Sequence, residues 1–428
     1  MKFRKTLAML LAGILAVSML SACGSTTDNP SSNEGNSGTS QSTSPEGNGN
    51  SEGNGSVSFS RAKIAFATNN TNEDFINMQN YYNTVLGPAL NIEFMYSEAL
   101  NDAGALTTFI ENAYAAGCQG VITDLAQAMD QGAAVANDLG MYYVGTSSAD
   151  AVDNRGLEFY ISVVGASAEG YGESYAEAIK SVVDDGGEHS VIILSGAAAY
   201  GATSAIEGTA GSLRALQDVF GLKYDQDVNT LATSGTQTEA TNDKGIKITI
   251  VPGMADLTAL VSPLLQTGEY DVVVGTTDIY GSLSVTVDEV EKATGKNISF
   301  ISRNPLSETV SVAFNSSDST GHPVMDAMVA QGMYERISAA IVLRNCIDGY
   351  AEQMKNGAEC SRIAGMRPLV VTSADQFNTL ASSDLPYCFT TTDEILALCC
   401  LNNSSVTYAD IDAFGASLTA TNILEKFS

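Results

Sequence analysis

The chain has 428 residues, which is too long for one ordinary hydrophobic core, so two lobes are expected. Hydrophobic residues make up 44% of it, enough to bury a sizeable core. The 20 Lys and Arg against 49 Asp and Glu give a formal net charge of -29 at pH 7, and a surface of this sign excludes nucleic acid as a partner.

The N-terminus has the pattern of an export signal. A basic start, Met1 to Lys5, precedes an almost wholly apolar run from Thr6 to Leu20. This run is shorter than the roughly 20 residues of a membrane-spanning helix. Leu20-Ser21-Ala22-Cys23 then resembles the bacterial lipoprotein cleavage box. We therefore predict a signal peptide over residues 1–22 and a lipid on Cys23 that anchors the protein to the membrane; an ordinary secretory leader with a chance Cys is the alternative.

Residues 23–60 are dominated by Ser, Gly, Asn, Thr and Glu, with scarcely an apolar residue. Such a segment cannot bury enough surface to fold, so we expect a disordered tether. A tether between a lipid and a folded body indicates that the folded body acts close to the outer face of the membrane.

The folded body opens with AKIAFATNNTNEDF, Ala62 to Phe75. The apolar run around Ile64 and Phe66 predicts a strand buried on both faces. Polar residues 69–72 follow, and Glu73 and Asp74 then open a helical pattern. Because ligands of open α/β sheets bind outside the carboxyl ends of strands, this loop is a candidate binding element.

The same unit recurs along the chain. Hydrophobic spacing predicts further strands at 91–96, 120–123 and 141–146, with helices at 102–116 and 126–139. A second series has strands at 159–164, 190–194, 247–251, 271–275 and 297–301, with helices at 169–183, 203–220, 255–266 and 282–294. Residues 302–323 have an irregular pattern, and a strand at 324–331, a helix at 334–350, a return strand at 368–371 and a helix at 408–424 follow.

Alternating strands and helices predict an α/β fold with two similar doubly wound parallel-sheet lobes joined by a multi-crossing hinge. We assign residues 61–165 plus 331–365 to the first lobe. Residues 166–330 plus 366–428 are assigned to the second lobe.

The order of elements resembles the type I periplasmic binding proteins, the ribose-, galactose- and xylose-type receptors of ABC transporters. The resemblance spans about Ala62 to Val371 and is carried by AKIAFATNN, SVIILSG, DVVVGTTDIYG and MVAQGMYERISAAI. It implies a ligand between two lobes, bound by Asn69, Asn70, Asp74 and Phe75 in the first lobe, Asp278 in the second lobe and Gln331 at the hinge. We add Ser147, after the fourth strand, and Tyr200 and Tyr280, which follow two strands of the second lobe, to the expected ligand-binding residues. Amides and carboxylates suit adjacent hydroxyls, and an aromatic ring suits an apolar sugar face.

Structural roles compete with these assignments. Asp278 could cap the following helix, the Asn pair and Gln331 could lie in solvated turns, and the tyrosines could pack within loops. The chain also departs from the family, because Ile206 and Glu207 stand where sugar-binding members commonly have an Arg. Thr146, Ser147 and Ser148 likewise replace an Asp-Arg pair, which leaves Arg155, Arg303 and Arg336 as candidate replacements.

Motifs for catalysis are missing. The sequence has no GxSxG, HExxH, Walker or GxGxxG pattern, and His189 and His322 are its two histidines. Without a CxxC spacing a zinc site is not expected, and we predict no metal or cofactor. Cys360 and Cys388 are the pair to test for a disulfide, whereas Cys118 and Cys346 lie among apolar neighbours and are expected to be buried thiols.

These features predict a lipid-anchored extracytoplasmic solute-binding protein of an ABC importer, not an enzyme. Its expected partners are a small polar ligand, by preference a sugar or sugar-like molecule, an ABC permease and the membrane, and we expect a monomer. Three alternatives stay open: a sensing lipoprotein that docks on a receptor, a nucleoside or signalling-molecule binder, and a lipid-anchored hydrolase.

Overall fold

The computed structural model describes residues 58–147, 153–196, 198, 201–253, 255–330, 334–382 and 389–427. The predicted signal peptide, the predicted lipidation site Cys23 and nearly all of the tether lie outside the described residues, as do Tyr200, Gln331 and Cys388. Residues 56–428 form one compact unit. Within the described ranges, no helix combines the length and the apolar character that a membrane crossing needs.

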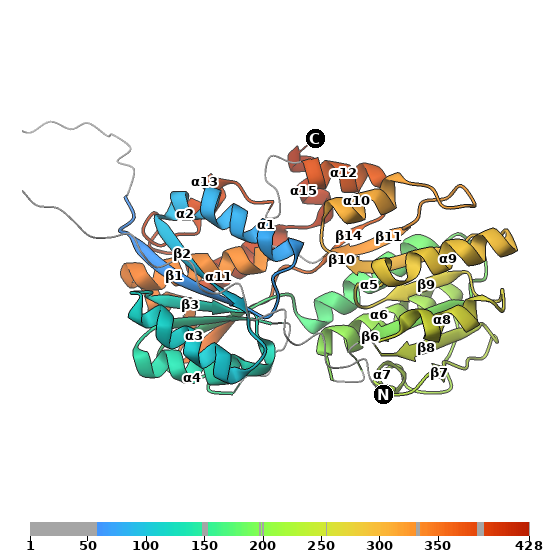
Figure 1. The fold of residues 1–428 in the computed structure, drawn as a ribbon, viewed down its shortest axis with the longest axis horizontal. Coiled ribbons are helices and arrows are strands. Elements are labelled where there is room, and N and C mark those ends of the chain that lie inside the picture. The colour runs from blue at the N-terminus through green and yellow to red at the C-terminus, as the bar shows by residue number, and fades with distance from the viewer. Residues whose placement is uncertain are drawn as a thin grey trace, which may run out of the picture. The chain divides into compact units, whose positions relative to one another are not determined.

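Two seven-stranded sheets organise this unit (Figure 1). The first contains β1 (Ala62–Thr68), β2 (Ile92–Ala99), β3 (Gly120–Thr123), β4 (Tyr142–Thr146), β5 (Tyr160–Val164), β12 (Lys355–Asn356) and β13 (Glu359–Ile363). The second contains β6 (Val191–Gly196), β7 (Thr238–Glu239), β8 (Ile248–Pro252), β9 (Val272–Gly275), β10 (Ser299–Asn304), β11 (Ala327–Ala330) and β14 (Leu369–Val371).

The strand order is β12-β13-β5-β4-β3-β1-β2 in the first sheet and β14-β11-β10-β9-β6-β8-β7 in the second. All neighbours run parallel except at the edges, where β12 pairs with β13, β14 with β11 and β7 with β8 in the antiparallel sense. The predicted fold class, two doubly wound parallel-sheet lobes, is therefore confirmed.

Helices cover both faces of each sheet (Figure 1). The first lobe carries α1 (Glu73–Tyr81), α2 (Gly87–Leu90), α3 (Ala103–Ala115), α4 (Met129–Leu139), α11 (Tyr334–Asn345), α13 (Thr392–Ala397) and α14 (Tyr408–Ser417). The second carries α5 (Ala168–Val183), α6 (Thr203–Phe220), α7 (Val228–Ala232), α8 (Leu257–Leu265), α9 (Tyr280–Thr294), α10 (Glu308–Asn315), α12 (Ala374–Ser382) and α15 (Ala420–Phe427).

Strand β1 shows why these sequences fold this way. Ile64 and Phe66 pack into the same core as residues of α1 and α11, whereas Ala65 and Ala67 pack with α3 and α4. Both faces of the strand are therefore buried, as the apolar run predicts. Strand β6 repeats the arrangement in the second lobe, with Val191 and Ile193 facing α5 and α6 and the intervening residues facing α8 and α9.

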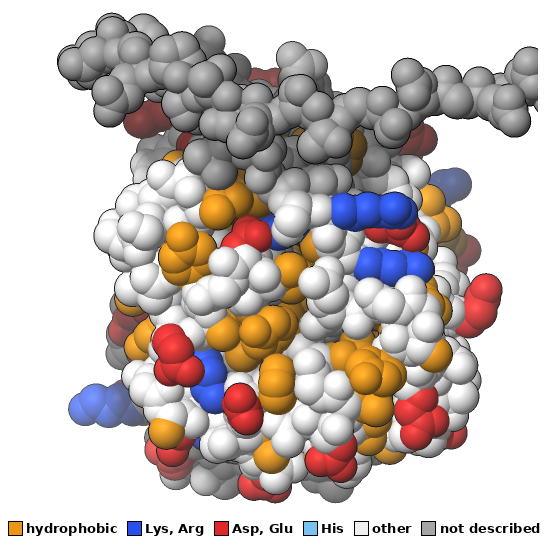
Figure 2. Space-filling model, turned by 90° about the vertical axis from the view of Figure 1, so that its left-hand side faces the viewer, with side chains coloured by type: hydrophobic (Ala, Val, Ile, Leu, Met, Phe, Trp, Pro, Cys, Tyr) orange, Lys and Arg blue, Asp and Glu red, His pale blue; other side chains and the backbone are white. Residues whose placement is uncertain are grey.

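One face of the first lobe carries charges of both signs. Figure 2 shows its outer side, where acidic and basic side chains are scattered among uncharged and hydrophobic ones.

Up to β14, the chain passes between the lobes after β5, after β11 and after β13; it changes lobe again between α12 and α13 and between α14 and α15. The first crossing needs glycine, because Gly165 has a φ of 143° and a Cβ there would lie 2.5 Å from the carbonyl oxygen of Ser147. At the third crossing the backbone N–H groups of Ala364 and Gly365 donate to Oδ1 of Asp412 at 2.6 and 2.7 Å. Helix α14 therefore braces the hinge.

The segment after β14 packs differently from the predicted lobe assignment. Residues 366–428 were all expected in the second lobe, and β14, α12 and α15 pack there. Helix α13 instead contacts α2, and α14 contacts β13 and α11, all in the first lobe. Amphipathic spacing identifies a helix but not the surface that it covers, so this division could not be read from the pattern.

Four local predictions differ from the structure. The region 302–323, expected to be irregular, contains α10, whose N-cap Ser307 accepts a hydrogen bond from Val310 N at 3.4 Å. Strand β13 was not predicted, and the expected helix 408–424 is broken between α14 and α15. The expected strand 324–331 is shorter, since β11 spans Ala327–Ala330.

Cys118 and Cys346 are buried free thiols, as predicted. Cys360 is also a buried free thiol, and its proposed partner Cys388 lies outside the described residues.

Candidate functional site

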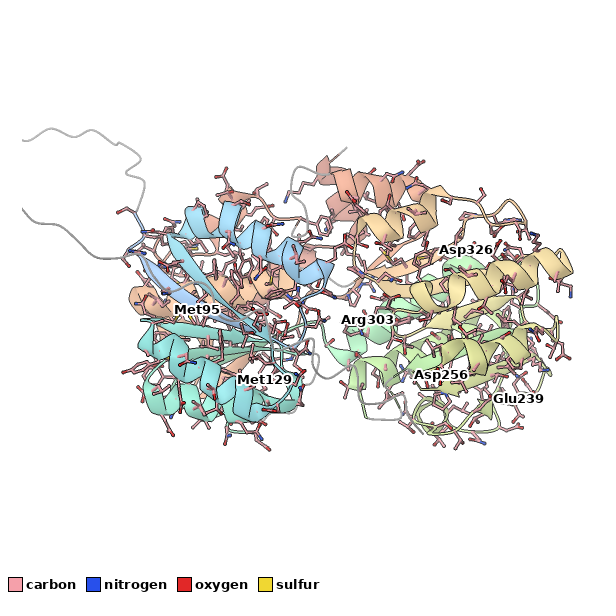
Figure 3. All side chains as sticks on the ribbon, viewed as in Figure 1. Met95, Met129, Glu239, Asp256, Arg303 and Asp326 are labelled. Carbon is pink, nitrogen blue, oxygen red and sulfur yellow. The ribbon has the colours of Figure 1, made fainter. Side chains whose placement is uncertain are left out.

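A cavity of about 230 Å³ opens at the carboxyl ends of the strands of the first sheet. Its walls come from both lobes and from the first turn of α11, which follows the second crossing. The lining residues among those described are Thr68, Asn69, Asn70, Asn72, Asp74, Phe75, Asp124, Thr146, Ser147, Tyr171, Arg303, Glu335 and Arg336. Figure 3 places Arg303 on the side of the second lobe that faces the first.

The loop between β1 and α1 forms one wall and is held by its own side chains. Oδ1 of Asn72 caps α1 by accepting from Phe75 N at 3.1 Å, and Oδ1 of Asn70 accepts from Asn72 N at 2.9 Å. The Thr68 hydroxyl donates to the carbonyl oxygen of Asn70 at 2.8 Å. The loop is therefore preorganised, and the side chain of Asn69 is exposed beside it.

Asp124, which follows β3, ties this loop to the sheet. One of its carboxylate oxygens accepts from Asn69 N at 2.8 Å, and the other lies 2.9 Å from the Thr68 hydroxyl, whose single proton it shares with the Asn70 carbonyl oxygen. Burial raises the pKa of Asp124, and the hydrogen bond from Thr68 opposes this shift.

Asp74 and Arg336 form an ion pair in the same wall. Nη1 of Arg336 lies 2.8 Å from Oδ2 of Asp74, and the two side chains are 15% and 14% exposed. The Tyr82 hydroxyl donates to the backbone carbonyl of Arg336 at 2.5 Å, which fixes the first turn of α11.

Arg303 and Tyr171 form the second-lobe wall. Nη2 of Arg303 donates to the Tyr171 hydroxyl at 2.6 Å, and the guanidinium carbon lies 4.4 Å from the centre of the tyrosine ring. Burial raises the pKa of Tyr171 to about 12 although Arg303 lowers it, so Tyr171 is a neutral phenol at physiological pH.

Glu335 connects the cavity to the hinge. Its Oε1 accepts from Ala166 N, at the first crossing, at 2.8 Å. Burial raises the pKa of Glu335, and the hydrogen bond from Ala166 acts in the opposite direction. Two of the crossings are thereby linked beside the cavity.

The structure brings five of the sequence-predicted site residues together, since Asn69, Asn70, Asp74, Phe75 and Ser147 all line the cavity. Phe75 is only 3% exposed, because its ring packs against Phe66 and Tyr96. This leaves little of the ring for stacking on a ligand.

Asp278 and Tyr280 are not among the described residues that line the cavity. Asp278 is exposed, and its Oδ1 accepts from Tyr280 N, the first amide of α9, at 3.1 Å. This hydrogen bond resembles the helix-capping role that was the alternative to ligand binding. Tyr280 packs partly buried against the core. Tyr200 and Gln331 lie outside the described residues.

Of the three candidate arginines, Arg303 and Arg336 line the cavity. Arg155 is not among the described lining residues, and its backbone carbonyl accepts from Cys360 N at 2.8 Å. The other lining residues were not selected from the sequence: Thr68, Asn72, Asp124, Thr146, Tyr171 and Glu335. Their common signal is position at a strand end or in the first turn of a following helix.

Amide, hydroxyl, carboxylate and guanidinium groups thus converge on one cavity, which suits a small molecule with many hydrogen-bonding groups. In the described part of the chain, no cluster of three or more His, Cys, Asp or Glu side chains could hold a metal ion.

The fold is that of known solute-binding proteins. A periplasmic sugar-binding protein from Pseudomonas fluorescens is 11% identical with a TM-score of 0.54, covering 80% of this chain and 95% of its own. An ABC transporter periplasmic solute-binding protein from Actinobacillus succinogenes with bound D-allose is 16% identical with a TM-score of 0.50, covering 74% and 99%.

A Mycobacterium smegmatis ABC transporter solute-binding protein with bound glycerol is 15% identical with a TM-score of 0.50, covering 77% and 100%. No family model matches the sequence, and no curated protein matches it. The resemblance to type I periplasmic binding proteins is therefore confirmed for the fold.

Proposed function

We propose that this protein is a lipid-anchored extracytoplasmic solute-binding protein that captures a small polar ligand, a sugar or a sugar-like molecule, for an ABC permease. The observation that carries the proposal is the cavity between two lobes, lined by polar and charged side chains from both of them. A ligand held by both walls favours the closed arrangement of the lobes, because it gains contacts there that the open arrangement lacks.

The kind of ligand follows from the lining groups. Among the described lining residues, every side chain is polar or charged apart from Phe75, which is nearly buried, and Tyr171. Such a wall recognises hydroxyl-rich molecules by hydrogen bonds rather than by apolar contact. The structural neighbours named above include proteins with bound D-allose and glycerol, which agrees with this class.

The ligand test is a thermal-shift screen of sugars, polyols, nucleosides and amino acids, followed by calorimetric titration of each hit. A true ligand raises the melting temperature by mass action. Asn69→Ala should weaken its binding by about 10-fold through loss of one hydrogen-bonding amide at the cavity. Asn80→Ala, an exposed Asn on α1 that is not a described lining residue, is the matched control and should leave affinity unchanged.

Two further observations distinguish transport from catalysis and import from sensing. A bound compound should be recovered chemically unchanged, and recovery of a cleaved product would identify a hydrolase instead. Genes for a permease and an ATPase beside this one would agree with import, whereas a sensor kinase gene there would favour a sensing role.

A further inference from the structure

Five charged side chains line the cavity among the described residues: Asp74, Asp124, Arg303, Glu335 and Arg336. The three carboxylates are each engaged by protein groups, as described above, and Arg336 is paired with Asp74. Of the two arginines in the cavity, Arg336 pairs with Asp74, whereas Arg303 forms no ion pair with any carboxylate of the described residues. The Glu335 carboxylate interacts with the Arg303 charge through space, but the two make no ion-pair contact.

The Arg303 guanidinium is nevertheless held in place. Its single side-chain hydrogen bond within the described residues goes from Nη2 to the Tyr171 hydroxyl, and the tyrosine ring covers one face of the group. The backbone N–H of Arg303 donates to the carbonyl of Thr277 at 3.4 Å. Four of the five guanidinium N–H donors therefore have no described protein partner.

A guanidinium with unpaired N–H donors binds an oxyanion more strongly than it binds a hydroxyl group. Its planar fork binds two oxygens of a carboxylate in parallel, and these charge-assisted bonds are about twice as strong as neutral ones. A neutral sugar that closed the lobes would instead leave the Arg303 guanidinium removed from water with most of its N–H donors unpaired and, among the described residues, with only the Glu335 carboxylate, which is outside ion-pair contact, to balance its charge. This removal from water is costly.

The two walls of the cavity are chemically different. The first-lobe wall presents the amides of Asn69 and Asn70 and the hydroxyls of Thr146 and Ser147, which are groups that bind sugar hydroxyls. The second-lobe wall presents Arg303. A ligand that spans the cavity therefore meets amides and hydroxyls, beside Asp124 and the Asp74–Arg336 pair, at one end and the Arg303 guanidinium at the other.

We infer that the ligand is a sugar acid whose carboxylate pairs with Arg303 and whose hydroxyl groups bind the first-lobe wall. This inference rests on the proposed function and narrows it from polar solutes to carboxylated ones. It assigns Arg303 as the residue that selects between a sugar acid and the corresponding neutral sugar.

The test uses the full chain and matched pairs of compounds: hexuronates and aldonates, each beside its neutral parent sugar, titrated calorimetrically. We expect at least one acid to bind more tightly than its parent by on the order of 100-fold, the size of a charge-assisted bidentate contact. Arg303→Gln should remove that preference, and Arg303→Lys, which keeps the charge but loses the fork, should restore part of it. Arg214→Gln, at an exposed arginine on α6, should change nothing.

Circular dichroism melting of each variant shows whether it is folded at the titration temperature. If neutral sugars bind and Arg303→Gln leaves their affinity and the acid-to-neutral ratio unchanged, the inference is overturned while the proposed function stands. If neither acids nor neutral sugars bind the wild-type chain, both are overturned.

Discussion

Arg336 and Asp74 pair across the first-lobe wall of the cavity, with Nη1 2.8 Å from Oδ2, although 262 residues separate them in the chain. Burial alone would lower the pKa of Arg336, but the charges of Asp74 and Asp124 outweigh this and raise it. The wall is therefore assembled by the protein's own charges before a ligand arrives, which reduces the ordering that binding must impose.

Breaking this pair should destabilise the fold. Asp74→Asn removes the charge of the carboxylate that the largely buried Arg336 guanidinium contacts, and we expect the free energy of unfolding to fall by about 2 kcal/mol. Urea denaturation without ligand measures this. Glu93→Gln, which removes the partner of the exposed Arg61, should change stability little. Equal losses in the two variants would show that the Asp74–Arg336 pair contributes no more than a surface pair.

Glu291 should make stability depend on pH. It is 1% exposed, its Oε1 accepts from Ile298 N at 2.7 Å, and burial raises its pKa from 4.5 to about 7. A raised acid pKa favours the protonated form in the folded state, so its contribution is full below about pH 4.5 and is lost as the pH rises to 7. Glu291→Gln should therefore stabilise the protein at pH 8, by on the order of 2 kcal/mol, and have little effect near pH 4.5.

The measurement is urea unfolding across this pH range. Glu289→Gln, at an exposed position of the same helix, is the matched control and should run parallel to the wild type. A Glu291→Gln curve parallel to the wild type at all pH values would rule out a titrating Glu291.

The two hydrogen bonds that Asp412 accepts at the third crossing should be measurable by hydrogen exchange. Asp412→Ala removes the acceptor of the Ala364 and Gly365 amides, so both should exchange faster, and stability should fall by about 1–3 kcal/mol. Asp410→Ala on the same helix instead removes a helix cap, because Oδ2 of Asp410 accepts from Thr407 N. If both variants leave exchange at 364–365 unchanged, α14 does not brace the hinge.

Membrane attachment is predicted to depend on Cys23. Cys23→Ala removes the residue that would carry the lipid, so most of the protein should move from the membrane fraction to the soluble extracytoplasmic fraction. Fractionation followed by immunoblotting measures this. Cys118→Ala, at a buried thiol, should leave the distribution unchanged. Retention of the Cys23→Ala chain on the membrane would contradict lipid anchoring at this position.

Local sequence determined the strand–loop–helix unit from β1 to α1. Ile64 and Phe66 in an unbroken apolar run predict a doubly buried strand, and Asn72 before Glu73 predicts a helix start. These features depend on interactions between residues close in sequence, such as the bond from Phe75 N to Asn72. The repeated pattern of such units likewise predicted two parallel sheets, because short connecting helices permit little else.

The cavity was decided by tertiary structure. Asp278 and Asn70 both follow buried strands, yet only Asn70 lines the cavity, because the Asp278 carboxylate turns back to the first amide of α9. Arg303 and Arg336 stand in different elements, and their sequence neighbours do not reveal that both face one space. Which strand ends meet depends on strand order and on the chain crossings, and these are set by packing between residues far apart in the sequence.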